Sequence, residues 1–330
     1  MSERPSHPAI LAWIAGMMFA AVVIVAYGHG HIDRMTSGDG YFYRYVAQHL
    51  DASKGQVAPI VAARGPALRY GRIALPALIW LLSGGRSGLM RYVQPIIMVL
   101  AAGAIAASAR TLLKARGLWL LLPFVSLGLT LSIAGGYAEA ISVAFLLAAA
   151  VEATNERWLV MAMLCALAML SRENSALVVL GFVGWVGSRK GWRIAFVTAT
   201  SFVPVTLWHL VVWNRFGHLP LLDPYVAHGA QVSKVPFLSL WRGLTRYGLE
   251  AFAIAAVHIV LWIVAFGVRR GRMLGWLAVA AGLQLAAIPL LNWHYAGDNL
   301  RLLSMMEVFT VLAIAAWTLS RRRALAGEAR

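Results

Sequence analysis

Long uncharged apolar runs constrain the fold of this chain more than any other feature of its sequence. The first is Pro8–Gly28, and similar runs recur almost to the C-terminus; a run of about 20 apolar residues is typical of a membrane-spanning helix. Of the 330 residues, 60% are hydrophobic and only 13% are charged, about half the charged share of a soluble domain. We therefore predict an all-α polytopic membrane protein, with residues 1–330 forming a single transmembrane domain.

The first apolar run is expected to remain in the mature protein as a membrane anchor. Its apolar core is longer than that of a cleaved signal peptide, and no small-x-small cleavage pattern follows it. Further apolar runs come after it, which fits a polytopic protein.

Basic residues in the short connections predict the topology. Three connections, Arg110–Arg116, Arg189–Arg193 and Arg269–Arg272, are basic, as is the tail from Arg321 to Arg323, and the positive-inside rule puts all of them in the cytoplasm. Both termini, including the tail 324–330, are then inside, and the chain has about ten spans, with a range of roughly 9–12. The predicted spans are 8–28, 92–109, 117–133, 137–151, 158–171, 174–188, 194–213, 249–268, 273–291 and 302–320.

The segment Ile73–Gly85 is apolar but does not fit this alternation. It corresponds to only ~20 Å of helix, whereas the hydrocarbon core of a bilayer is ~30 Å thick. We predict that it forms a re-entrant or interface-lying helix inside one large outer loop, residues 29–91.

Ionisable and aromatic residues gather on the predicted outer face. A charged residue at or inside the membrane boundary is energetically expensive and by default marks a functional site. Since the cytoplasmic loops hold little beyond Lys and Arg, we predict a polar cavity that opens to the outer face of a helical bundle. The residues of this outer-face set are Asp39, Tyr41, Tyr43, Arg69, Tyr70, Arg72, Tyr137, Glu139, Arg172, Glu173, His294 and Arg301.

These residues also have simpler interpretations. Asp39 lies between two glycines, which is good turn chemistry. The arginines of the segment Arg69–Arg72 would only extend to lipid head groups in the simpler interpretation. Independently, Glu139 would be the solvated end of a helix. Arg172 and Glu173 are adjacent, and a tight turn would let them pair with each other. The sequence leaves both kinds of interpretation open.

Polar residues inside the apolar runs are expected to be structural. His209 and His258 are interpreted as packing histidines, Cys165 as a packing residue, and Glu307 in the last run as one buried acid paired to a neighbour. The net charge of +16 is assigned to basic loops that face anionic lipid, and nucleic acid is not expected as a partner.

The outer loop is basic although it faces outward. Arginine recognises phosphate with bidentate geometry. A nucleotide sugar stays in the cytoplasm, so the phosphate-bearing partner expected on the outer face is a lipid-linked phosphosugar. The basic residues of this loop are Arg34, Arg44, Lys54, Arg64, Arg69, Arg72 and Arg86.

Four short motifs resemble, in their order, the GT-C superfamily of membrane glycosyltransferases. The sequence "GDGYFYRYVA" opens the loop that follows the first span. The later "RYGRIALP", "GGYAEAISVAFL" and "SREN" look like bacterial members that use polyprenyl-phosphate sugars, the mannosyltransferase-like proteins. The resemblance implies a GT-C-like fold and an enzyme of the bacterial plasma (inner) membrane whose active site faces the extracytoplasmic side.

The resemblance also implies roles for individual residues. Asp39 corresponds to the first-loop Asp that acts as base toward the acceptor hydroxyl, and the sugar is transferred by direct displacement with inversion. Many members carry a second acid beside the first, but here Gly40 follows, so Glu139 is the first candidate for a second carboxylate. The other members of the outer-face set are expected to bind substrate.

The predicted activity is therefore transfer of mannose or a similar sugar to an envelope glycan or lipid acceptor. Two other functions stay open: a transporter or flippase for a lipid-linked or anionic solute, and a structural subunit of an envelope complex. The expected partners are the polyprenyl-phosphate sugar, the acceptor and membrane lipids. No cofactor is expected, and the sequence gives no support for a divalent metal.

Overall fold

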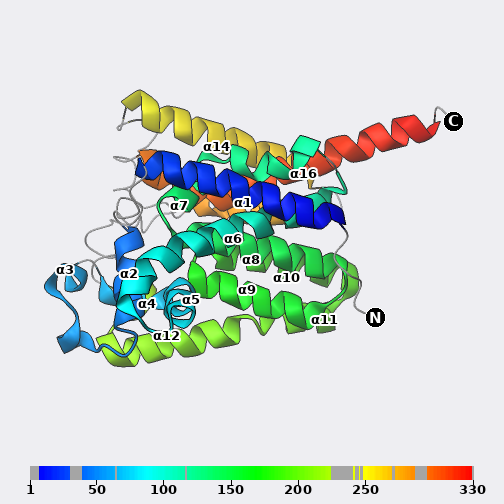
Figure 1. The fold of residues 1–330 in the computed structure, drawn as a ribbon. Coiled ribbons are helices and arrows are strands. Elements are labelled where there is room, and N and C mark those ends of the chain that lie inside the picture. Colours follow the sequence, from blue (N-terminus) through cyan, green and yellow to red (C-terminus); the bar gives the residue numbers. More distant parts are fainter. Residues whose placement is uncertain are drawn as a thin grey trace.

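The computed structural model describes residues 7–29, 39–63, 65–115, 117–223, 241, 245, 248–269, 272–286 and 296–328. Helices and their connections account for all of them, and this part of the chain has no strand (Figure 1). The elements of the first half are α1 (His7–Gly28), α2 (Asp39–Gln48), η2 (Lys54–Gln56), α3 (Pro59–Ala62), α4 (Pro66–Gly71), α5 (Ala74–Ser83), α6 (Ser87–Leu113), η3 (Gly117–Val125), α7 (Leu127–Ala134) and α8 (Ala138–Thr154). Those of the second half are α9 (Trp158–Ser171), α10 (Ser175–Lys190), α11 (Trp192–Ala199), α12 (Phe202–Phe216), η4 (Pro220–Leu222), α14 (Gly248–Val268), α15 (Met273–Gly282), η6 (Leu283–Ala286) and α16 (Ala296–Glu328).

The all-α prediction is confirmed, and several helices are long and apolar enough to cross a membrane. Five meet that test among the described residues, and a sixth does if η3 and α7, which are bent by 81° where they join, count as one span. Every segment predicted as a span contains helix. The predicted number of about ten spans is nevertheless not confirmed, because helices such as α9 and α15 are short.

Small residues let neighbouring helices approach closely. Gly16 of α1 faces α6 so directly that a methyl group there would lie 2.5 Å from the carbonyl oxygen of Ala102. In the same contact, Gly103 of α6 faces the indole of Trp13. Within a membrane, close packing of this kind drives helix association in place of the hydrophobic effect. A larger residue at either glycine would therefore force α1 and α6 apart.

The basic connections gather at one end of the bundle. Arg323, near the end of α16, donates from Nη2 to the carbonyl oxygen of Lys114 at 3.0 Å. Arg272, which precedes α15, donates to the hydroxyl of Ser320 at 2.6 Å. Figure 1 shows the short helices α2, α3 and α4 at the opposite end from the C-terminus of α16. This grouping is the one that the topology prediction requires, while the side of the membrane that each end faces stays a prediction.

The segment predicted as re-entrant or interface-lying forms α5. With 10 residues it is about 15 Å long, which is half of the ~30 Å hydrocarbon thickness. It packs between α2 and α6 and ends at Gly84, whose φ of 59° is the left-handed value that glycine adopts at a helix end.

A polar contact lies inside the bundle, at Glu307 of α16. His258 of α14 approaches one carboxylate oxygen of Glu307 through Nε2 at 2.9 Å. Ser126, which caps the start of α7, donates its hydroxyl to the other oxygen at 2.5 Å. Glu307 is thus a buried acid with neighbouring partners, as predicted, and His258 is held as a packing histidine, with Nδ1 2.7 Å from the carbonyl oxygen of Ile254.

Candidate functional site

The candidate site lies where the short helices of the first loop meet the ends of longer ones. Helix α2 packs on α5, α6 and α4, and α4 packs on α12. The carboxylate of Asp223, after η4, accepts a hydrogen bond from the backbone N–H of Ala67 at 2.9 Å and so fixes the start of α4. This arrangement brings the first loop against the turns that precede α8 and α10.

Gln94 of α6 joins the start of α2 to the turn before α8. Its side-chain amide donates to the carbonyl oxygen of Gly136 at 2.8 Å and to that of Gly40 at 3.3 Å. Gly136 has φ of 69°, and a methyl group there would lie 2.7 Å from the Gln94 amide nitrogen. The backbone of Asp39, the first residue of α2, is therefore held near the segment that carries Glu139. The side chain of Asp39 lies outside the described part of the structure.

Glu139 and Arg172 form one buried ion pair. Arg172 Nη2 lies 3.1 Å from Glu139 Oε1, and the two side chains are 4% and 1% exposed. Glu139 lies in the first turn of α8, where the helix dipole favours an acid, and Arg172 follows the last residue of α9. An ionised group is buried at this depth only when it is paired.

The Glu139–Arg172 pair keeps hydrogen-bonding capacity. Arg172 Nε and Nη1 and both carboxylate oxygens of Glu139 have no hydrogen-bond partner among the described residues. A buried polar atom without a partner costs about 1–3 kcal/mol, and such atoms point to a water molecule or a polar ligand. Arg172 therefore offers two donor atoms for an anionic ligand.

Arg72 and Glu173 form a second pair. Arg72 donates from Nε to Glu173 Oε2 at 2.8 Å and from Nη2 to Oε1 at 2.5 Å, the fork geometry of a strong arginine–carboxylate contact. Burial raises the pKa of Glu173, but the charges of Arg72 and Arg172 outweigh it and lower the pKa from 4.5 to about 2. Arg172 and Glu173 thus point to different partners, so the simple pairing of these neighbours with each other is not what the structure shows.

Arg69 and Arg301 each lie on an aromatic ring. Arg69 Cζ is 4.6 Å from the centre of the Phe42 ring, and Arg301 Cζ is 4.1 Å from that of Tyr137, the residue before α8. Arg69 and Arg72 are each 6% exposed, so neither snorkels to lipid head groups. Arg301 comes close to α8, near the turn that carries Glu139.

The predicted tyrosines have different environments. Tyr41 is 42% exposed, whereas Tyr43 and Tyr70 are buried. The Tyr70 hydroxyl donates to the carbonyl oxygen of His49 at 2.7 Å, and its ring packs on Phe216. Burial, the largest cause, raises the pKa of Tyr70 well above its usual value, so this phenol stays neutral. The predicted substrate-binding residue His294 lies outside the described residues.

Two residues of the site were not predicted from the sequence, Gln94 and Asp223. Gln94 is an amide within an apolar run, and this feature of the sequence could have indicated a buried polar contact. The sequence gives no such indication for Asp223. This residue lies in a long loop, and its partner in α4, Ala67, is 156 positions away in the sequence.

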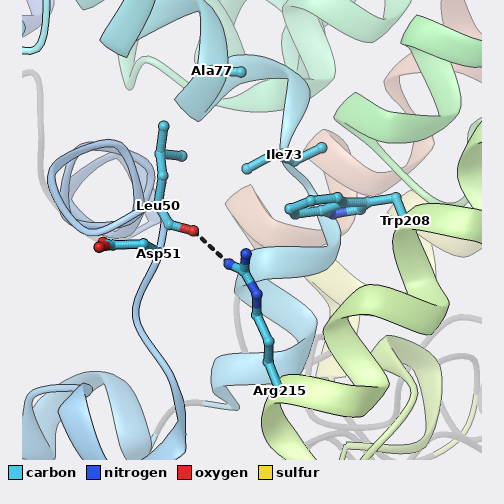
Figure 2. Close-up of a pocket in the computed structure, with 6 residues that line it drawn as sticks. All are labelled: Leu50, Asp51, Ile73, Ala77, Trp208 and Arg215. Carbon is cyan, nitrogen blue, oxygen red and sulfur yellow. Dashed lines mark hydrogen bonds between the residues drawn. The ribbon is translucent and has the colours of Figure 1, made fainter.

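A pocket of about 370 Å³ lies between the turn after α2, the start of α5 and α12 (Figure 2). Its wall residue Ile73 directly follows Arg72 in the chain, and Trp208 donates to the carbonyl oxygen of Tyr70 at 2.8 Å. The described residues hold no group of three His, Cys, Asp or Glu side chains that would bind a metal ion.

No protein family, curated protein or solved structure shows a significant match to this chain. The resemblance to the GT-C superfamily therefore rests on the short motifs alone.

Proposed function

We propose that this protein is a membrane glycosyltransferase. In this proposal it transfers mannose or a similar sugar from a polyprenyl-phosphate donor to a glycan or lipid acceptor of the cell envelope. The reaction takes place at the extracytoplasmic face of a bacterial plasma membrane, with Asp39 as the general base.

The observation that supports this proposal best is the convergence of motifs that are far apart in the sequence. Gln94 links the start of α2, where Asp39 lies, to the turn before Glu139. Glu139 is paired to Arg172, and the neighbouring Glu173 is paired to Arg72 of the first loop. Ionisable residues buried next to membrane-spanning helices mark functional sites by default, and these come from the stretches that resemble glycosyltransferase motifs.

The proposed reaction is a single displacement. The acceptor hydroxyl oxygen attacks the anomeric carbon of the donor sugar while its proton passes to the Asp39 carboxylate. The bond from that carbon to the phosphate oxygen breaks, and the electron pair leaves with the polyprenyl phosphate. General-base assistance of this kind contributes ~10²–10⁴-fold to the rate.

Arg172 is the residue that we assign to the departing phosphate. Its Nε and Nη1 lack partners among the described residues, whereas two donor atoms of Arg72 bind Glu173. A preorganised cation stabilises charge where it develops in the transition state. In this assignment Glu139 is a positioning residue, because it holds the guanidinium of Arg172 in place.

The test uses the purified full-length protein in liposomes with a radiolabelled polyprenyl-phosphate sugar. The proposal expects the label to move to an envelope acceptor, with release of an equal amount of polyprenyl phosphate. Transport of the intact donor between leaflets, without cleavage of the sugar–phosphate bond, would contradict the proposal and favour a flippase. Buried arginines that lie close together would suit a glycosyltransferase and a flippase equally. Cleavage of the sugar–phosphate bond is therefore the result that distinguishes the two functions.

A further inference from the structure

The pocket between α2, α5 and α12 has an apolar interior and charged groups at its edge. Ile73, Ala77 and Trp208 form the apolar part, and Asp51 and Arg215 are the charged residues that line it. Figure 2 shows the Arg215 guanidinium below the space that Ile73 and Trp208 border. The volume, about 370 Å³, is at the lower end of the range for small-molecule sites, which is enough for a head group and the first part of one hydrocarbon chain.

The helix that forms one wall of this pocket has an exposed apolar face. Helix α12 belongs to the candidate span Trp192–Phe216, of which only 17% of the most apolar window is buried inside the protein. Its outer side chains, including Leu207, Leu210 and Val211, are exposed. Lipid molecules are therefore the natural neighbours of the pocket.

The polar and apolar parts of the pocket are arranged as the parts of a lipid are. Arg215 is next to Phe216, where the candidate span ends, so in a membrane its guanidinium would be at the level of lipid head groups. Trp208 precedes it by seven positions, which places it on the same helix face and ~10 Å closer to the middle of the membrane. A lipid beside α12 would thus have its phosphate near Arg215 and its chain along Trp208.

The charges at the edge of the pocket balance each other. Arg215 Nη1 donates to the carbonyl oxygen of Leu50 at 2.6 Å, and a guanidinium has further N–H donors with which to bind phosphate. Asp51 is exposed, and Figure 2 shows its carboxylate pointing away from the guanidinium. One cation and one separate anion match a head group that carries both a phosphate and an ammonium group.

We propose that this pocket binds a zwitterionic phospholipid with an ethanolamine head group. Arg215 binds its phosphate, Asp51 faces its ammonium group, and one acyl chain lies on Trp208 and Ile73. The proposal goes beyond the glycosyltransferase function and does not depend on it. The net charge of +16 attracts anionic lipid to the protein in general, so a preference for ethanolamine lipid would be a property of this pocket.

The test is native mass spectrometry of the full-length protein in detergent with equal amounts of phosphatidylethanolamine and phosphatidylglycerol. We expect the wild type to retain the ethanolamine lipid, and Arg215→Ala to retain about tenfold less, the loss expected for one charge-assisted hydrogen bond. Arg193→Ala is the matched control, because Arg193 also lies near a tryptophan ring, at 5.8 Å compared with 6.0 Å for Arg215, but does not line the pocket.

Asp51→Asn gives an independent result, since it changes an exposed, nearly isosteric side chain and leaves the Arg215 contact to Leu50 in place. It should shift retention from the ethanolamine lipid toward phosphatidylglycerol. Unchanged retention in Arg215→Ala, or an unchanged preference in Asp51→Asn, would overturn the proposal. Displacement of the ethanolamine lipid by added polyprenyl phosphate would overturn it as well, because the pocket would then belong to the donor site.

Discussion

Arg72 and Glu173 are joined by two hydrogen bonds, at 2.8 Å and 2.5 Å, although 101 positions separate them in the sequence. This contact fastens the first loop to the turn between α9 and α10. It also leaves Arg172, the neighbour of Glu173, directed toward Glu139. The geometry of the candidate site therefore depends on this pair.

Removing one partner of the Arg72–Glu173 pair should destabilise the protein. Loss of one partner from a buried ion pair costs ~3–5 kcal/mol, and we expect the low end, about 3 kcal/mol, because the Glu173 side chain is 20% exposed. Thermal unfolding in detergent of Arg72→Ala, Glu173→Ala and the double variant measures the effect. The double variant should be less destabilised than the sum of the two single variants; strict additivity would show that the pair contributes nothing.

The contribution of Glu173 should depend on pH. Its pKa falls from 4.5 to about 2 on folding, because the Arg72 and Arg172 charges outweigh the effect of burial. The stability from ionised Glu173 is then fully present above about pH 4.5 and is lost as the pH falls toward about 2. The difference in melting temperature between wild type and Glu173→Gln should shrink over this window. A difference that stays constant from pH 6 down to about pH 3, within this window, would contradict the assignment.

Arg172→Lys should weaken the use of the donor substrate. Lysine keeps the charge but loses the planar fork and the Nε and Nη1 donors, so we expect KM for the polyprenyl-phosphate sugar to rise about tenfold. Arg157→Lys is the matched control, since Arg157 also pairs with a glutamate, Glu152, at 3.5 Å, but is 64% exposed. Equal KM values for the two variants would remove Arg172 from the phosphate site.

Gly136→Ala should reduce turnover through Gln94. Gly136 and Gly117 have nearly the same φ, 69° and 70°, but only at Gly136 would a methyl group meet a neighbour, the Gln94 amide at 2.7 Å. Both alanine variants carry the same backbone strain, so Gly117→Ala controls for it. We expect kcat to fall in Gly136→Ala alone. An equal loss in both would mean that the link between α2 and α8 has no role in positioning the site.

The predicted sides of the membrane are tested by cysteine labelling. Cys165 is fully buried, so the wild-type chain gives little background. Gly55→Cys, at an exposed position with nothing within 4 Å, should react with an impermeant reagent in intact cells. Arg322→Cys, in the exposed tail, should react only after the membrane is opened. The reverse pattern would put the candidate site in the cytoplasm and rule out the proposed donor.

The longer helices could be predicted because a run of about 20 apolar residues is typical of a membrane-spanning helix. The break between η3 and α7 could not, since the segment 117–133 reads as one apolar run. Two residues mark the break in the sequence: Pro123, and Ser126, whose side chain caps α7. Hydropathy does not detect either of them, because it measures only how apolar a segment is. The bounds of α9, Trp158–Ser171, by contrast agree with the predicted span 158–171.

The sequence indicated which ionisable residues to consider for the candidate site, and their roles stay predictions, but it did not indicate which of them contact each other. An ionisable residue at the membrane boundary is energetically expensive and so was taken to mark a functional site. The four residues that form ion pairs are Arg72, Glu139, Arg172 and Glu173. The choice of partners depends on how α8, α9 and the first loop pack, so neighbours in the sequence were the only pairing that could be considered. For the same reason the role of Gln94 appeared only in the structure.

The transfer rate of Asp39→Asn decides whether Asp39 is the general base. The variant keeps the size of the side chain but removes the base. Transfer from a polyprenyl-phosphate sugar should be measured in membranes beside Glu156→Gln, which alters an exposed acid paired with Lys190. We predict that Glu156→Gln keeps the wild-type rate and that Asp39→Asn loses ~10²–10⁴-fold with its expression unchanged. An Asp39→Asn rate above about a tenth of wild type, more than loss of a general base allows, would show that Asp39 is not the general base.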